Sequence, residues 1–192
     1  TIGAHVSRSP NHQTLRRSNI ENRFNTACIG AFGYEMDLSV ISAEETKAVL
    51  RQIKWYKKHR ETLQFGTYYR TKSVFDGGCS GWEIVSADKR SAVVNETNGI
   101  TELFAPQTFM KVYGLDPDTV YTVENRPQYL SSGDKHDSDA FCTAIGEGED
   151  VIAAAEASNP KDCERERHEV SGKTLGKVGV RLNTEWAAAI RP

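Results

Sequence analysis

The sequence has no pair of cysteines near enough to form a C-x-x-C metal or redox unit. The closest two of its four cysteines, Cys142 and Cys163, are about twenty positions apart, and the others are Cys28 and Cys79. This spacing excludes zinc ribbons and thioredoxin-like redox motifs. Cys28 lies in an apolar run and is expected to be a small buried hydrophobe. The sequence therefore indicates a reduced, intracellular protein, and we predict a cytoplasmic location.

Long hydrophobic runs are also missing. No stretch approaches the roughly eighteen apolar residues that a membrane span needs, and the start has no basic region followed by an apolar one. We therefore expect neither a membrane segment nor a signal peptide. The content of 38% apolar and 26% charged residues is typical of a soluble globular protein. The chain opens at Thr1 inside an apparent strand, which suggests a piece of a longer protein.

The net charge of -2 is small but unevenly distributed. Residues 1–60 carry ten Lys/Arg against five Asp/Glu, whereas residues 132–170 carry four against eleven. A basic segment can indicate nucleic-acid binding. Here the basic residues lie mostly on one face of an expected helix, which is the pattern of a solvated surface. We therefore expect no nucleic-acid partner and no membrane contact.

The first third alternates strand and helix patterns. Residues 2–7 and 32–40 are expected to be strands, and the segment between them has a helical apolar face that includes Ile20 and Phe24. Ser42 and Glu45 form a capping box, after which apolar residues recur at three- and four-residue spacing. We predict a helix from Ala43 to about Arg60. Strand followed by helix, twice, is typical of an α/β fold with βα units.

The pattern changes near residues 63–65. Short runs rich in β-branched and aromatic residues follow, separated by turn residues, and this favours an all-β antiparallel sandwich. The runs are "QFGTYYRTK", "GWEIVS", "RSAVVN", "FMKVYG", "TVYTVE", "TLGKVGVRL" and "EWAAAI". Residues 127–170 are acidic and poor in strand pattern, with one alanine-rich helical turn at 150–158. We therefore divide the chain into 1–63 and 64–192, with an irregular insertion at about 127–170.

Histidines and serines near the start raise the question of a site. His5 and His12 are separated by a proline and have no evident third ligand, so we predict no metal. Ser7 and Ser9 lack the G-x-S-x-G surroundings of a nucleophile elbow. No cofactor motif is present, so we predict no cofactor. The remaining histidines are scattered and carry no signal: His59, His136 and His168.

Glu35 and Asp37 are two apart, so on a strand they point to the same side. Two carboxyl groups with different pKa values can perform glycosidic hydrolysis. Carboxylates at strand ends more commonly cap a helix or pair with arginine, and three arginines are near in sequence: Arg16, Arg17 and Arg23. We therefore assign no catalytic role to this pair. Residue chemistry alone gives βα units and a β-sandwich, and leaves the function open.

Several long segments, in order, resemble one family. They are "GAHVSRSPNHQTLRR", "ENRFNTACIGAFGYEMDL", "IKWYKKHRETLQFGTYYR", "GWEIVSADKRSAVV", "VYGLDPDTVYTV" and "SGKTLGKVGVRL". Together they resemble the C-terminal part of α-galactosidases of glycoside hydrolase family 36. Residues 1–125 and 171–192 carry the likeness. Gly81 departs from it, since a small apolar residue is expected before Trp82, and so do Thr174 and Gly176 in the last motif.

The resemblance implies that residues 1–63 form strands 7 and 8 and the last helix of a TIM (β/α)8 barrel, and that a C-terminal β-sandwich follows. It implies a parent enzyme that hydrolyses terminal α-galactosides of the melibiose and raffinose type with retention. The family's two catalytic aspartates precede the region matched here, and its K-x-D-x-N motif occurs nowhere in the chain. We therefore expect no catalytic residue in this stretch and no hydrolysis by the chain alone.

The segment after the first strand is expected at the rim of the active site, where the βα loops of a barrel gather. His5, Asn11 and His12 are our rim candidates, with a role in orienting neighbours by hydrogen bonds. Arg16 and Arg23 are expected to hold carboxylates or to contact another subunit. The expected partners are an α-galactoside, through the parent enzyme, and further copies in a homo-oligomer.

Two other functions stay open at this point. One is a sugar-binding or purely structural β-sandwich, in which a tryptophan stacks on sugar; the candidates are Trp55, Trp82 and Trp186. The other lies within the family: an α-N-acetylgalactosaminidase or a galactosyl-transferring synthase.

Overall fold

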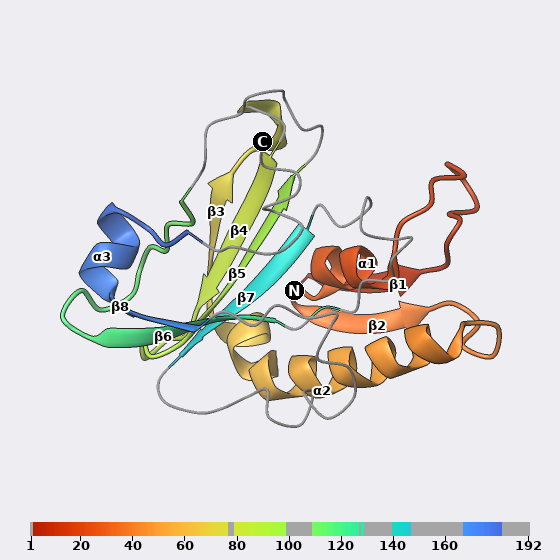
Figure 1. Cartoon of the computed structure of the whole chain (residues 1–192), viewed down its shortest axis with the longest axis horizontal. Coiled ribbons are helices and arrows are strands. Elements are labelled where there is room, and N and C mark those ends of the chain that lie inside the picture. The colour runs from red at the N-terminus through yellow and green to blue at the C-terminus, as the bar shows by residue number, and fades with distance from the viewer. Residues whose placement is uncertain are drawn as a thin grey trace.

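A computed structural model describes residues 2–76, 79–98, 109–126, 128, 140–146 and 167–181. The described part contains a two-stranded parallel sheet with two helices and a six-stranded sheet with a short helix (Figure 1). None of its helices is long and apolar enough to cross a membrane.

The first sheet is built from two βα units in succession. The elements are β1 (Gly3–Ser7), α1 (Ile20–Ala27), β2 (Ala31–Glu35) and α2 (Ala43–Phe65). β1 and β2 are parallel, with Gly3 opposite Ala31 and Ser7 opposite Glu35. The capping box is present, because the Ser42 side chain accepts from the Glu45 N–H and Glu45 accepts from the Ser42 N–H. The prediction of two βα units is confirmed, although α2 ends at Phe65 and β2 already at Glu35.

The two faces of the parallel pair differ. Val6 is fully buried, and Phe32 and Tyr34 pack against the same core as α1 and α2. The opposite face carries His5 and Glu35, which are exposed. A two-stranded parallel sheet that is covered by helices on one face only is the arrangement of neighbouring strands in a larger βα sheet or barrel.

Aromatic residues dominate the core beneath the helices. The Phe24 ring lies edge-on to Phe32 and to Trp55, with centroids 5.2 and 5.9 Å apart. The chain then turns sharply at Gly30, whose φ of 63° is left-handed. A Cβ there would clash with the backbone oxygen of Ile2. Glycine therefore lets α1 pass directly into β2.

The second sheet is antiparallel throughout, in the order β3-β4-β5-β7-β6-β8. Its strands are β3 (Thr67–Lys72), β4 (Cys79–Val85), β5 (Ala92–Asn98), β6 (Val120–Asn125), β7 (Ala140–Gly146) and β8 (Arg167–Ser171), and a 3-10 turn, η1 (Val74–Asp76), follows β3. Ile84 and Val93 join the core of the βα units. The other face, with Val94, packs against Val112 and the helix α3 (Gly172–Lys177), so the sheet lies between α3 and the βα units (Figure 1).

Three expectations for this part were wrong. Residues 109–114 form an isolated bridge between Met110 and Val180 instead of a strand. The stretch from Gly172 is the helix α3, because Ser171 caps it by accepting from the Thr174 N–H. The supposedly irregular insertion at 127–170 contains β7 and the start of β8, and β7 is central in the sheet.

The sandwich stays a prediction. The described residues form a single antiparallel sheet here, and the domain boundary after residue 63 falls inside α2. The expected helical turn at 150–158 and the expected strand at 185–190 lie outside the described residues.

A buried ion pair joins the βα units to the second sheet. Glu21 of α1 and Arg126, just after β6, are 0% and 2% exposed, and their side chains are 2.7 Å apart. Arg126 also donates to the Asn25 side chain and lies over the Phe24 ring. Gln52 of α2 donates to Glu21 at 2.8 Å. One charged pair thus links α1, α2 and the end of β6.

We predict that Arg126→Met lowers the free energy of unfolding by about 3–5 kcal/mol, because it leaves the Glu21 charge buried without its cation. The double variant Glu21→Gln with Arg126→Met is expected to lose less than the single one. Urea denaturation of the three proteins checks this. Equal losses in the single and double variants would contradict the role of the pair.

Candidate functional site

The carboxyl ends of β1 and β2 lie at the same edge of the parallel sheet. Some of the residues proposed from the sequence as site candidates lie near this edge. On the open face the His5 ring nitrogen lies 2.8 Å from the Glu35 carboxylate. The two side chains are 55% and 73% exposed. Since they come from neighbouring strands, the pair ties these strands together on the face away from the helices.

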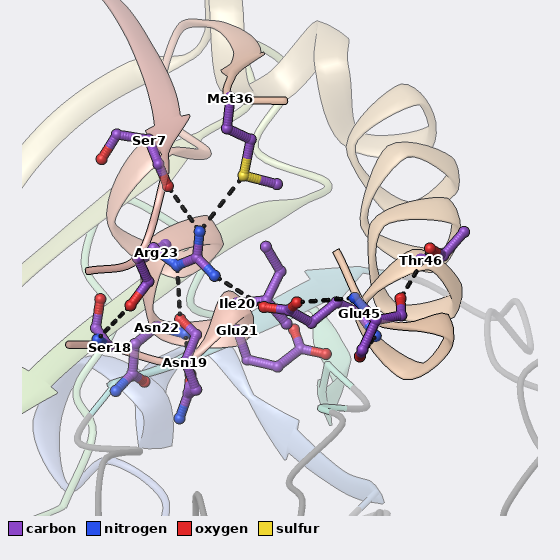
Figure 2. Close-up of polar contacts among 12 residues, drawn as sticks. Ser7, Ser18, Asn19, Ile20, Glu21, Asn22, Arg23, Met36, Glu45 and Thr46 are labelled. Carbon is purple, nitrogen blue, oxygen red and sulfur yellow. Dashed lines mark hydrogen bonds and ion pairs between the residues drawn. The ribbon is translucent and has the colours of Figure 1, made fainter. Parts of the chain in front are cut away.

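Arg23 of α1 is the centre of this edge (Figure 2). Its guanidinium donates to the backbone oxygen of Ser7 at 2.6 Å and to the sulfur of Met36 at 3.4 Å. It also pairs with Glu45 at 3.1 Å and donates to the backbone oxygen of Asn19 at 3.3 Å. One side chain therefore holds the end of β1, the turn after β2 and the first turn of α2 in fixed relation.

Burial shapes the charge of Arg23. Removal from water lowers the pKa of the guanidinium, and the Glu45 carboxylate acts in the opposite direction. An arginine so paired keeps its charge at neutral pH. The expectation that Arg23 holds a carboxylate is therefore confirmed, whereas Arg16 and Arg17 are exposed on the loop.

The loop after β1 is organised by Asn11. Its side-chain oxygen accepts from the backbone N–H groups of Gln13 and Thr14, both at 3.0 Å, and from the Thr14 hydroxyl at 3.2 Å. The backbone oxygen of Asn11 also accepts from the Leu15 N–H. Asn11 thus shapes a local turn, and its role at an active-site rim stays a prediction. His12 is exposed, and no hydrogen bond or ion pair joins it to His5 among the described residues.

Glu35 and Asp37 each have a different partner. The Asp37 carboxylate accepts from the Ser39 N–H at 2.8 Å and from its hydroxyl at 2.6 Å, and these bonds lower its pKa. Glu35 faces His5. Each carboxylate therefore has a local structural partner, and that partner is not an arginine.

Two groups with strongly shifted pKa values lie away from this edge. Burial raises the pKa of Glu83 to about 7, and the hydrogen bond from the Tyr113 N–H opposes the shift. Burial lowers the pKa of His59 to about 4, with Lys58 adding to the effect. Glu83 belongs to β4 and His59 to α2, where the histidine ring stacks on Trp55.

Metal binding and tryptophan stacking find little support in the described part of the chain. It holds no cluster of three or more His, Cys, Asp or Glu side chains that suits a metal ion. Trp55 is buried between Phe24 and His59, and Trp82 packs against the same core. These two rings are therefore core residues, and Trp186 lies outside the described residues.

Comparison with known families matches the chain twice, in order. Residues 1–66 match the Melibiase family, and residues 79–190 match the C-terminal domain of glycosyl hydrolase family 36. The chain belongs to glycoside hydrolase family 36. The family expected from the sequence motifs is thus confirmed, and the relatives of this family-36 chain are α-galactosidases.

AgaA of Geobacillus stearothermophilus is 38% identical over 128 residues, which are 67% of this chain and 18% of AgaA. An α-galactosidase of Lactobacillus acidophilus is 42% identical over 118 residues, 62% of this chain and 16% of the relative. The crystal structure of the family-36 α-galactosidase AgaB of G. stearothermophilus matches with a TM-score of 0.68 at 28% identity. That match covers 95% of this chain and 20% of AgaB. The family-36 chain thus spans about a fifth of the length of these relatives.

Sequence reasoning named Arg23 only as a holder of carboxylates and missed its bonds to Ser7 and Met36, and it also missed the Glu21–Arg126 pair. The position of Arg23 on the α1 face turned toward Glu45 was a usable signal, because an arginine on a semi-apolar helix face needs an acidic partner. Arg126 gave no such signal, since its partners come from the other end of the family-36 chain.

We predict that Arg23→Lys lowers the free energy of unfolding by about 1–3 kcal/mol, because a single ammonium cannot serve all acceptors of the planar guanidinium. Arg16→Lys on the exposed loop is the matched control, with a change within about 0.5 kcal/mol. Thermal and urea unfolding measure both. Equal stability of the two variants would exclude the anchoring role of Arg23.

We also predict a pH effect at Glu83. Its pKa is raised in the folded state, so folding favours the protonated carboxyl and stability falls as pH rises from about 4.5 to about 7. Glu83→Gln has no titrating carboxyl and does not lose this stability. The free energy of unfolding of the variant minus that of the unsubstituted protein should therefore be about 2 kcal/mol larger at pH 8 than at pH 5.

Urea denaturation at both pH values measures this change, and Glu61→Gln, at an exposed site on α2, is the control. Any fixed cost of burying the amide is the same at both pH values. A pH-independent difference between Glu83→Gln and the unsubstituted protein would contradict the raised pKa.

Proposed function

We propose that this chain is the C-terminal part of a retaining α-galactosidase, and that it supplies the last two βα units of the catalytic barrel together with the C-terminal β-sandwich. The observation that carries the proposal is the order of two structural parts along the chain. A parallel β1–β2 pair with helices on one face is followed by an antiparallel sheet, in the order of the two family matches.

The open face of β1 and β2 supports a place in a closed barrel. Residues of that face are small or polar, and the pair His5–Glu35 projects from it. In a barrel, the helices cover the outside of the strands and the other face turns inward. The outer edges of β1 and β2 carry backbone N–H and C=O groups that need neighbouring strands. Six further strands would supply these neighbours in a closed barrel of eight.

The proposed role of this stretch is to brace the active-site rim. Arg23 fixes the carboxyl ends of both strands, and Asn11 shapes the loop between β1 and α1. Barrel enzymes place substrate at this end of the strands. His5, Asn11 and His12 are therefore proposed as rim residues that hold neighbours in place.

Catalysis itself is assigned to other parts of the parent enzyme. Retaining hydrolysis uses two carboxyl groups roughly 5–5.5 Å apart, one as nucleophile and one as acid and base. Glu35 is paired with His5, and Asp37 is held by Ser39. Each carboxylate thus has a local structural partner, and we assign neither a catalytic role.

The proposed substrates are terminal α-galactosides of the melibiose and raffinose type. Support comes from the relatives: one crystal structure is of an AgaA variant from G. stearothermophilus in complex with raffinose, 32% identical with a TM-score of 0.65 over 75% of this chain. Another AgaA variant was crystallised with stachyose.

We predict that the isolated chain does not hydrolyse 4-nitrophenyl α-galactopyranoside above the buffer rate. Release of nitrophenol, followed by absorbance, measures this. The result that would contradict the proposal is turnover that disappears in Asp37→Asn or Glu35→Gln, since catalysis would then reside in this stretch. Turnover unaffected by both substitutions and removed by further purification indicates a contaminating enzyme.

A further inference from the structure

A groove lies on the six-stranded sheet, on the face that carries Val94 and packs against α3. We call it the sheet groove, and it encloses about 480 Å³. This volume falls within the roughly 300–1,000 Å³ of small-molecule sites. Its lining includes Thr71, Lys72, Glu96, Phe109, Lys111 and Tyr113.

Gly81 explains why the groove exists in this chain. It stands on β4 directly between Lys72 of β3 and Glu96 of β5 in the strand register. Without a side chain at this position, Lys72 reaches across β4 and pairs with Glu96 at 2.9 Å. A Cβ at Gly81 would lie 2.5 Å from the Thr71 hydroxyl. Gly81 is also one of the positions at which the sequence departs from the family resemblance.

The floor of the groove is polar, and Lys111 in the lining adds one positive charge to the pair of Lys72 and Glu96. Lys72 and Glu96 neutralise each other, and they offer hydrogen-bond donors and acceptors side by side. The Thr71 hydroxyl is buried and has no hydrogen-bond partner among the described residues. A buried hydroxyl without a partner is costly, but this atom lies too deep for a ligand in the groove to contact, so Lys72 and Glu96 supply the polar contacts.

The wall of the groove is aromatic and exposed. Phe109 and Tyr113 are 49% and 46% exposed, although both line the groove. The wall is held in place at two points. Glu83 accepts from the Tyr113 N–H, and Met110 pairs with Val180 by backbone hydrogen bonds. The rings therefore stand on a fixed segment.

We propose that the sheet groove binds a pyranose unit of a neutral saccharide. A pyranose has an apolar C–H face that covers an aromatic ring and a rim of hydroxyls that needs paired donors and acceptors. The rings of Phe109 and Tyr113 contact the apolar face, and the side chains of Lys72 and Glu96 bind the hydroxyls. The lining carries one more lysine than glutamate, so the choice of a neutral ligand rests on the two exposed rings.

The test is a calorimetric titration of the whole chain with raffinose, with maltose as a second neutral saccharide and inorganic phosphate as an anion. We expect a neutral saccharide to bind with a Kd on the order of 1 mM. Tyr113→Ala should raise that Kd about tenfold or more, since it removes one stacking ring.

Tyr68→Ala is the matched control. Tyr68 is 42% exposed and lies opposite Ile84 on the other face of the sheet, so its loss should leave the Kd unchanged. Melting curves of all variants show that each is folded. The proposal is overturned if neither saccharide binds, if phosphate binds in their place, or if Tyr113→Ala and Tyr68→Ala have equal effects. Binding is measured without turnover, so this outcome is independent of the proposed hydrolytic function.

Discussion

The contact on which the described structure depends is the buried ion pair between Glu21 and Arg126. It joins the helix that follows the first strand to the end of β6, and Gln52 and Asn25 complete the surrounding hydrogen bonds. Burying two charges costs several kcal/mol unless their geometry is good. Arg126 also lies over the Phe24 ring. The polar link to the sheet is therefore in direct contact with the aromatic core of the βα units. The sheet therefore determines where α1 lies, and α1 carries Arg23, which fixes the ends of both parallel strands.

This chain of contacts gives the antiparallel sheet a role in the proposed α-galactosidase. A rim loop is useful only if its ends are held in one place, and Arg23 holds them through Ser7 and Glu45. The antiparallel sheet supports that arrangement indirectly, because Arg126 holds α1 through Glu21. Its opposite face, by contrast, offers the groove floored by Lys72 and Glu96, so the two faces of one sheet serve different purposes.

The parts of the fold that sequence predicted are those governed by local physics. The capping box at Ser42 and the runs of β-branched and aromatic residues in β4 and β5 depend on residues a few positions apart, and both were found. The helix α3 was missed because a six-residue helix has too few turns to show an apolar period, and its start depends on one hydroxyl of Ser171. β7 was missed because a strand in the middle of a sheet need not alternate polar and apolar residues. The rim role of Asn11 stays a prediction, although its side chain bonds Gln13 and Thr14. The contact of Arg126 with Asn25 was missed because the two residues are 101 positions apart, and no local pattern joins them.

The central claim is that the βα units and the antiparallel sheet form one cooperative structure through the Glu21–Arg126 pair. Native-state hydrogen exchange tests it most directly, because it reports the free energy of opening for each amide. The account predicts that the amides of α1 and those of β4 and β5 open with the same free energy and the same dependence on denaturant. Exchange of α1 through a separate opening at lower free energy, with the sheet still protected, would contradict it.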